Sequence, residues 1–368
     1  MRVLFVAPLP PPVTGHSLAS QVLLDDLTRT HQVRVIDLSR DSQNDGGITP
    51  KRSIAVARSL GGILKKRAGV DAIYLTISES VAGNVKDLFV YLLCAGRLSR
   101  VFIHLHGGSI GRLLFERFKT LHRLNHLFVQ RFGGVIVSGK SHVPIFEGMI
   151  DRDKIHVVPN FAQDDLFVQR DAIEAKFART SPIRMLYISA MTRLKGFDVL
   201  TDGYLQLSER RRRELRIDFA GQFPSRAEEE QFRRKIERVE GLCYHGVVDD
   251  DAKRRMFADA HVFCLPTAHL EGQPISILEA YASGCVVLAT VPSGIRDIFT
   301  SLTNGYAIEP RSVPTMRATL ENLVTRRGDL LSIALRNRDI AEHHYRTSIY
   351  ATAIRRILER RVHAEEDN

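Results

Sequence analysis

The chain has 368 residues, more than one hydrophobic core usually serves, so two domains are expected. Its 44% hydrophobic and 26% charged residues are ordinary for a globular protein and exclude a disordered or fibrous chain. The net charge of +10 and the pI near 9.6 favour anionic partners, and leave nucleic acid, an acidic membrane surface and phosphorylated metabolites open.

The N-terminus, the apolar runs and the cysteines indicate the cellular compartment of the protein. The opening MRVLFVAPLPPP is typical of a buried first strand rather than a signal peptide, because its short apolar run ends in prolines. The longest apolar run, from Leu88 to Gly96, is about half of the roughly 18 residues that a membrane span needs. Cys94, Cys243, Cys264 and Cys285 form no CxxC pair, so neither a zinc site nor a disulfide framework is indicated. We expect a cytoplasmic protein.

Short apolar runs alternate with helical stretches along the whole chain. They are VLFVAP, VRVID, AIYLTI, VFIHLHG and GVIVSG in the first half, then IRMLYIS, LRIDFAG, HVFCLP and VVLAT. Continuous apolar runs are typical of parallel strands covered by helices on both faces. We therefore predict an α/β fold of two doubly wound Rossmann-like domains facing across a cleft. The expected boundaries are 1–165 and 175–340, followed by a helical tail, 341–368, that either frays or packs back on the first domain.

In such sheets ligands bind at the carboxyl ends of the strands, so functional residues are expected in the loops there. After the first expected strand comes Gly15, at a turn into a helix, which is either a phosphate or sugar contact or an ordinary βα turn. His106 follows the strand VFIHL and precedes two glycines, and it can present an imidazole to a substrate. His104 and His106 resemble a metal pair, but no third ligand stands at a suitable spacing, so no metal is predicted.

The basic segment 110–132 has helical spacing of Leu114, Phe118, Leu121, Leu124, Phe128 and Phe132. The same segment contains one acidic residue, Glu116, and five cations, namely Arg112, Arg117, Lys119, Arg123 and Arg131. The segment predicts an amphipathic helix, with Leu113, Phe115 and Leu127 widening its apolar face. Contact with an anionic membrane and a plain core-facing helix are both compatible with this pattern. Nucleic acid is disfavoured, since no nucleic-acid motif is present.

The segment YISAMTRLKGF places Arg193 and Lys195 in a loop between an expected strand and a helix. The two cations either bind a diphosphate or belong to a solvated turn. The glycine turns FAGQFPS and YHGVVDD, at Gly221 and at Gly246–Val247, either border a nucleobase or are simple turns.

The stretch HLEGQPISILEAYASGCVV contains two carboxylates among small and apolar residues. Pro274 suits a helix start, which puts Glu271 in the preceding loop and Glu279 in the helix. A carboxylate on an apolar helix needs donors from the protein or from a ligand, because burying an unpaired charge costs several kcal/mol. The residues alone do not decide between these two sources of donors.

These loops, in this order, resemble retaining glycosyltransferases of family four, which have the glycosyltransferase B (GT-B) architecture. The specific match is EGQPISILEAYASGCVVLAT followed by NGYAIEP, with supporting matches at LKGFDVL, VVPNFAQDDLF and ADAHVFCLPT. Two departures are Ser189 and Ala190, where the family commonly has Gly-Arg, and Thr14, where it often has a first glycine. The resemblance implies transfer of a sugar from a nucleotide-diphosphate sugar to a glycan or lipid-linked acceptor, with retention of configuration, as in bacterial envelope polysaccharide synthesis.

The resemblance also implies roles for single residues. Glu279 would bind the donor ribose, and Glu271 the donor sugar, so the hydrogen-bond donors to both carboxylates would come mostly from the ligand. The segment of Gly272, Gln273, Pro274 and Ile275 leads into the helix, whose first backbone amides would face the diphosphate, with Gly15 approaching it. Arg193 and Lys195 would neutralise the leaving diphosphate, and His106 would touch the sugar.

Two other classes of protein remain open. A nucleotide-sugar epimerase on the same fold would need further acid and base groups, and a catalytically silent partner subunit would have no need for Glu271, Glu279, Lys195 and His106. We expect no cofactor and no metal, because cations and helix amides can stabilise the leaving group.

Overall fold

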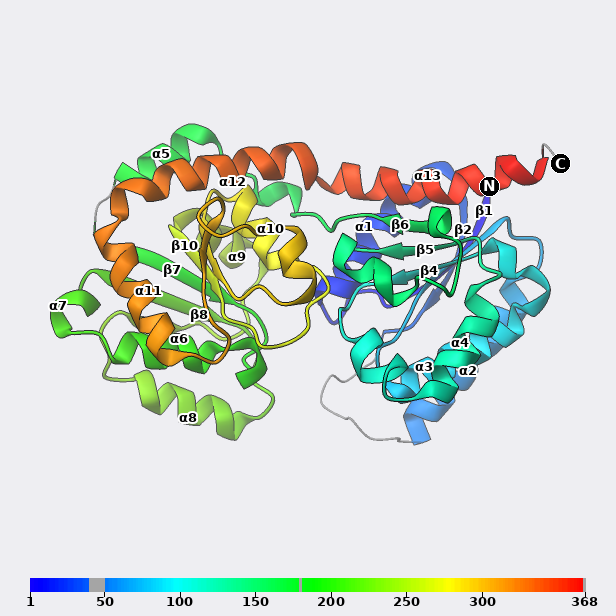
Figure 1. Cartoon of the computed structure of the whole chain (residues 1–368), viewed down its shortest axis with the longest axis horizontal. Coiled ribbons are helices and arrows are strands. Elements are labelled where there is room, and N and C mark those ends of the chain that lie inside the picture. Colours follow the sequence, from blue (N-terminus) through cyan, green and yellow to red (C-terminus); the bar gives the residue numbers. More distant parts are fainter. Residues whose placement is uncertain (40–49, 179–180, 367–368) are drawn as a thin grey trace. The chain divides into compact units, whose positions relative to one another are not determined.

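The computed structural model describes residues 1–39, 50–178 and 181–366 (Figure 1). The chain divides into two compact units. Unit 1 comprises Met1–Asn160, Leu270–Gln273 and Ser348–Asn368, and unit 2 comprises Phe161–His269 and Pro274–Thr347.

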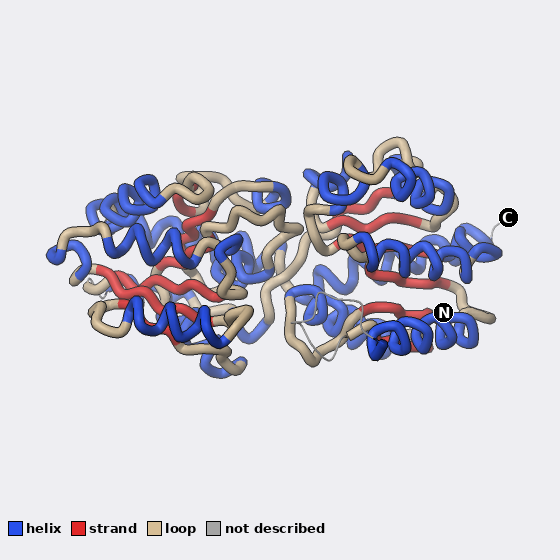
Figure 2. Tube along the Cα trace, turned by 90° about the horizontal axis from the view of Figure 1, so that it is seen from below, coloured by secondary structure: helices blue, strands red, loops and turns tan. Residues whose placement is uncertain are grey.

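Unit 1 contains a parallel sheet of six strands in the order β2-β1-β3-β4-β5-β6. The strands are β1 (Arg2–Ala7), β2 (Gln32–Asp37), β3 (Ala72–Thr76), β4 (Val101–Leu105), β5 (Gly134–Val137) and β6 (Ile155–Val157). Its helices are α1 (Gly15–Thr30), α2 (Pro50–Lys66), α3 (Val81–Leu93), α4 (Lys119–Val129) and α13 (Thr347–Glu366). In Figure 2 the strands of each unit lie together, with helices outside them.

The direction of each crossover decides which face of the unit 1 sheet a helix covers. α1 leads from β1 outward to β2, whereas α2, α3 and α4 lead in the opposite direction along the sheet. Because crossovers between parallel strands are right-handed, α2, α3 and α4 form one layer, and α1 lies on the other face. α13 joins the side of α1, where Arg355 Nε donates to Asp26 Oδ2 at 3.0 Å and His31 Nε2 lies 3.1 Å from Glu359 Oε1.

Unit 2 repeats this architecture with the strand order β12-β11-β10-β7-β8-β9. The strands are β7 (Ile183–Ile188), β8 (Leu215–Ala220), β9 (Leu242–Tyr244), β10 (Val262–Leu265), β11 (Val286–Ala289) and β12 (Gly305–Ala307). The helices are α5 (Arg170–Ala178), α6 (Phe197–Leu205), α7 (Glu209–Arg212), α8 (Arg226–Ile236), α9 (Asp250–Asp259), α10 (Ile275–Ala282), α11 (Val313–Thr325) and α12 (Leu330–His344).

The prediction of two doubly wound α/β sheets is confirmed, and all nine apolar runs form strands. The sequence did not indicate β6, β9 and β12, which have three residues each. The last unit boundary lies later than expected, since Ala341 and Tyr345 are buried in the core of unit 2. Among the described residues no helix is long and apolar enough to cross a bilayer.

The prediction of one continuous helix over 110–132 is wrong. Gly111–Phe115 forms a single π-helical turn, and α4 begins at Lys119 after Phe118, whose φ of −122° and ψ of 83° are not helical. Phe115 does not widen an exposed apolar face, because it is only 6% exposed and belongs to the core of unit 1.

Candidate functional site

Glu279 lies on α10 and is almost fully buried, with 2% of its surface exposed. Its neighbours Leu278 and Ala280 are completely buried, because α10 packs between strands and helices of unit 2. Lys253 on α9 donates from Nζ to Glu279 Oε1 at 2.6 Å and to Gln163 Oε1 at 2.6 Å. Burial raises the pKa of Glu279, and the Lys253 ammonium opposes this rise. The expectation that a ligand supplies most donors therefore needs correction for Oε1.

The second oxygen, Glu279 Oε2, receives no hydrogen bond from the residues that the structure describes. Lys253 fixes one oxygen of the carboxylate, and the other keeps its capacity to accept. The sequence did not reveal Lys253, which precedes Glu279 by a strand and a loop.

The loop after β7 holds Arg193 and Lys195 in one 3₁₀ turn that ends at Gly196. Gly196 has a φ of 79°, and a Cβ there would overlap the carbonyl oxygen of Pro266, so glycine is required. Ala268 N donates to Leu194 O at 2.7 Å, which joins this turn to the loop after β10. The Arg193 side chain is exposed and makes no ion pair with any described residue. The turn therefore presents a guanidinium at the carboxyl edge of the unit 2 sheet.

The loops after β8 and β9 meet at the same edge. Gly221 has a φ of 141° and lies against the carbonyl oxygen of Ser189, and its N–H donates to Gly246 O at 2.8 Å. Tyr244 Oη donates to Gly221 O at 2.7 Å, and the neighbouring Val247 is 73% exposed. This arrangement offers backbone groups and an exposed apolar side chain at the carboxyl end of β8, the strand next to β7, whose following loop carries Arg193.

The residues Leu270–Gln273 pack as part of unit 1, although both flanking segments belong to unit 2. Gly272 lies so close to His106 that a Cβ would overlap the His106 carbonyl oxygen. Asn160 N donates to Gln273 Oε1 at 2.5 Å, and Asn160 Nδ2 donates to Gln273 O at 2.7 Å. Glu271, in the loop as predicted, is 8% exposed. α10 begins at Ile275 with Pro274 as its N-cap, one residue later than the sequence indicated.

Three imidazoles pack against one another in unit 1 with their rings tilted. The ring of His104 lies 3.9 Å from that of His106, which lies 4.4 Å from that of His16, measured between centroids. Burial lowers the pKa of His16 to about 4, helped by Lys86, and lowers that of His104 to about 3. The pKa of His106 also falls well below its ordinary value for the same reason. All three rings are therefore neutral at pH 7.

One nitrogen of each ring has no hydrogen-bond partner among the described residues. His104 Nδ1 lies 2.7 Å from Tyr74 Oη, whereas Nε2 of His16, His104 and His106 is buried without a partner among the described residues. The sequence did not single out His16, although it follows Gly15 in the turn into α1. Thr14 caps that helix by accepting from Ser17 N at 3.0 Å, which leaves Gly15 exposed at the first position.

Glu79 is a further residue that the sequence did not indicate. Its Oε1 accepts from Ser109 N at 2.5 Å and from Ile110 N at 2.9 Å, and its carboxylate occupies the space that a Cβ at Gly107 would need. Gly107 thus permits a carboxylate to fix the loop after β4, which carries His106.

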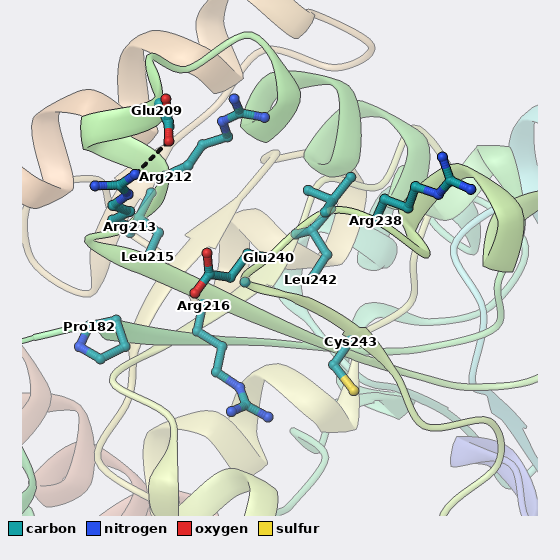
Figure 3. Close-up of a pocket in the computed structure, with 12 residues that line it drawn as sticks. Pro182, Glu209, Arg212, Arg213, Leu215, Arg216, Arg238, Glu240, Leu242 and Cys243 are labelled. Atoms are coloured by element: carbon teal, nitrogen blue, oxygen red, sulfur yellow. Dashed lines mark hydrogen bonds and ion pairs between the residues drawn. The ribbon is translucent and has the colours of Figure 1, made fainter.

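Unit 2 also has a cavity of about 640 Å³ (cubic ångström) at the amino ends of β8 and β9. Its charged lining residues are Arg212, Arg213, Arg216, Arg238, Glu209 and Glu240, and Arg213 is bonded to Glu209 (Figure 3). None of the predicted site residues lines it, since they follow the carboxyl ends of the strands. Among the described residues, one set of side chains lies close enough together to hold a metal ion, namely Asp218, Cys243 and His245. Within this set Asp218 Oδ2 already forms an ion pair with Arg216 Nε at 3.3 Å.

Solved structures of similar fold define the class of the protein. HepE of Anabaena, in complex with UDP and glucose, is 16% identical with a TM-score of 0.73, and the match covers 98% of this chain and 99% of that one. Sucrose-phosphate synthase of Thermosynechococcus elongatus is 12% identical with a TM-score of 0.73, over 99% of this chain and 100% of that one. These likenesses and the two parallel sheets define a two-domain GT-B fold.

Residues 169–338 match the model of the family described as glycosyl transferases group 1. A protein of Escherichia coli strain K12, WcaL, named as a proposed colanic acid biosynthesis glycosyltransferase, is 25% identical over 195 residues. That match covers 50% of this chain and 46% of the relative, less than half of the relative's length. Segment 169–338 of this chain is thus similar to the glycosyl transferase group 1 domain.

Proposed function

We propose that the protein transfers a sugar from a nucleotide-diphosphate sugar to an acceptor hydroxyl, with retention of anomeric configuration. The bond from the anomeric carbon to the diphosphate breaks, and the bond to the acceptor oxygen forms on the same face. The hydroxyl proton leaves with the diphosphate. The group 1 domain and the UDP and glucose held by HepE support a nucleotide-sugar donor.

The observation that carries the proposal is the state of Glu279. Its carboxylate is buried on α10, Lys253 holds Oε1, and Oε2 has no donor among the described residues. Such a group suits two vicinal hydroxyls of a ribose, since a charge-assisted hydrogen bond stabilises a bound hydroxyl by roughly 1.5 to 3 kcal/mol. Gly221 and Val247, at the same sheet edge, would border the base.

The remaining roles concern charge on the leaving group. Arg193 and Lys195 would bind the diphosphate as its negative charge grows, and the amides at the start of α10 would assist. Glu271 and His106 would bind the donor sugar, and Gly15 would admit the diphosphate close to α1. These cations supply the positive charge that a metal ion supplies in other enzymes, so we propose catalysis without a metal.

The acceptor class follows from the relatives by analogy alone. WcaL is named for colanic acid synthesis, which favours a glycan or lipid-linked acceptor of the bacterial envelope. The predicted cytoplasmic location agrees with use of soluble nucleotide sugars.

A thermal-shift panel of UDP, GDP, ADP and their sugars tests the donor class. A ligand at 100 times its Kd adds about 2.7 kcal/mol of stability, so one nucleotide should raise the melting temperature clearly above the others. For that nucleotide, calorimetry should show affinity lowered by roughly 1.5 to 3 kcal/mol in Glu279→Gln. A flat panel would favour a catalytically silent subunit, and unchanged affinity would refute the ribose role.

Two further measurements test the chemistry. The anomeric proton of the product, observed by NMR, should have the same configuration as the donor, and inversion would contradict retention. Turnover should persist after treatment with a chelator, and its loss with recovery on adding a divalent cation would contradict metal independence.

A further inference from the structure

The outer side of α3 carries an uninterrupted apolar stripe. Val81, Val85, Phe89 and Leu92 are 42%, 38%, 54% and 59% exposed. Their spacing of four, four and three residues places them within an arc of about 80° on a helix with 3.6 residues per turn. Scattered exposed apolar residues are ordinary on a protein surface, but four aligned on one helix face indicate a binding surface.

α4 adds two exposed leucines with cations beside them. Leu124 and Leu127 are 39% and 56% exposed. Helical spacing puts Arg123 on the far flank of Leu127, and Arg131 follows two residues after the end of α4. Both arginines are exposed, so the apolar centre of α4 has one cation on its flank and another just past its end.

α3 and α4 belong to one layer and are joined by side-chain hydrogen bonds. The buried amides of Asn84 on α3 and Asn125 on α4 exchange hydrogen bonds of 3.2 and 2.8 Å. Both helices lie on the same side of the unit 1 sheet, next to one another, because they connect β3, β4 and β5 in that order (Figure 1). Their outer side chains Val81, Val85, Phe89, Leu92, Leu124 and Leu127 are called the α3–α4 face below.

The charge around the α3–α4 face is strongly positive. Within α3 the acidic residue Asp87 is buried and lies 2.7 Å from Lys86 Nζ, so it contributes little negative charge outside. From 111 to 131 the five cations noted above face a single acid, Glu116. An apolar surface with such a border suits lipid headgroups and the upper acyl chains of an anionic bilayer, whereas a protein partner would need an acidic border of its own.

We propose that the α3–α4 face docks on the surface of an anionic membrane. Val81, Val85, Phe89, Leu92, Leu124 and Leu127 enter the interface, and Arg123 and Arg131 contact lipid phosphates. This docking does not depend on the proposed reaction. If the reaction also holds, the geometry favours a membrane-held acceptor: α3 begins at Val81, two residues after the Glu79 that fixes the His106 loop.

Vesicle co-sedimentation of the full chain tests the docking directly. Vesicles of phosphatidylglycerol mixed with phosphatidylcholine should bind the protein, and vesicles of phosphatidylcholine alone should bind it far more weakly. Arg123→Gln/Arg131→Gln should lower the partition coefficient by about 25-fold, since each cation at such a surface contributes about fivefold. Phe89→Ser/Leu92→Ser should lower it by on the order of tenfold, through lost apolar burial.

Matched controls lie on α13, which is not part of the α2–α4 layer. Arg356→Gln/Arg360→Gln removes the same charge, and Ile349→Ser removes a side chain that is 42% exposed. Both controls should retain wild-type binding, and all variants should keep the wild-type circular dichroism melt because every changed side chain is exposed.

Three results would overturn the proposal. One is equal binding to both kinds of vesicle, and another is an equal loss in the α13 controls. The third is a dimer in light scattering that Phe89→Ser/Leu92→Ser dissociates, which would show that a second copy covers the α3–α4 face. None of these measurements uses a sugar donor, so a negative result leaves the proposed reaction standing.

Discussion

The ion pair between Lys253 and Glu279 gives the sharpest test of the unit 2 site. Lys253→Met keeps the aliphatic part of the side chain and removes the ammonium. Glu279 then remains as a carboxylate whose side chain is 3% exposed, without its donor at 2.6 Å. The paired variant Lys253→Met/Glu279→Gln removes both charges while keeping both shapes close to the original.

The size of the effect follows from burial. Removing one partner of a buried ion pair costs about 3 to 5 kcal/mol. The Lys253 side chain is 19% exposed, so water already screens part of the attraction, and we expect about 3 kcal/mol for Lys253→Met. Because the double variant leaves no unpaired charge, it should lie within about 1 kcal/mol of the wild type.

Urea unfolding followed by circular dichroism measures these free energies, since the chain has no tryptophan for fluorescence. The loss in Lys253→Met should shrink as the pH falls, because burial already raises the pKa of Glu279 and a protonated carboxyl needs no cation. A loss below about 1 kcal/mol, or a double variant no more stable than Lys253→Met, would show that the pair does not act as described.

Three further outcomes are expected. Lys195→Ala should lower kcat more than donor affinity, because the leaving diphosphate is most charged in the transition state, and equal losses in both would contradict this role. Gly272→Ala should lower the melting temperature of unit 1, since its Cβ would overlap the His106 carbonyl oxygen, and an unchanged melt would show that the loop adapts. His16 and His104 have lowered pKa values of about 4 and about 3. As the pH falls, these histidines take up protons in the unfolded state before they do so in the folded state, because their pKa is lower in the folded state. The free energy of unfolding should therefore decrease from about pH 6.5 toward pH 4, by up to about 1.4 kcal/mol per pH unit for each histidine. His16→Gln should flatten that profile in urea titrations, and an identical slope would contradict the assignment.

The strands were predictable because their apolar content is continuous. Val3 to Ala7 of β1 are fully buried on both faces. A continuous apolar run of this length predicts a central strand of a parallel sheet that helices cover on both sides. The edge strands β6, β9 and β12 escaped prediction because three residues are too few to show a pattern. The helix break at Phe118 also left no sign, since the apolar spacing continues through it while the backbone does not.

Side-chain partners were less predictable than the elements that carry them. The sequence placed Glu271 in a loop and Glu279 on a helix, because Pro274 marks where the helix starts. It could not supply Lys253, since the pairing of α9 with α10 depends on the packing around β10. The contact of His16 with His106 likewise joins the first turn of α1 to the loop after β4, which only the strand order brings together.

α13 has a consequence for biosynthesis. Tyr350, Ile354 and Leu358 of this helix are buried in unit 1, yet they follow all of unit 2 in the chain. On a ribosome, the segments of unit 2 are complete while the nascent unit 1 still exposes the side of its sheet that α13 later covers. The domain that is translated first is therefore the one that matures last, and it must stay soluble through the synthesis of its neighbour.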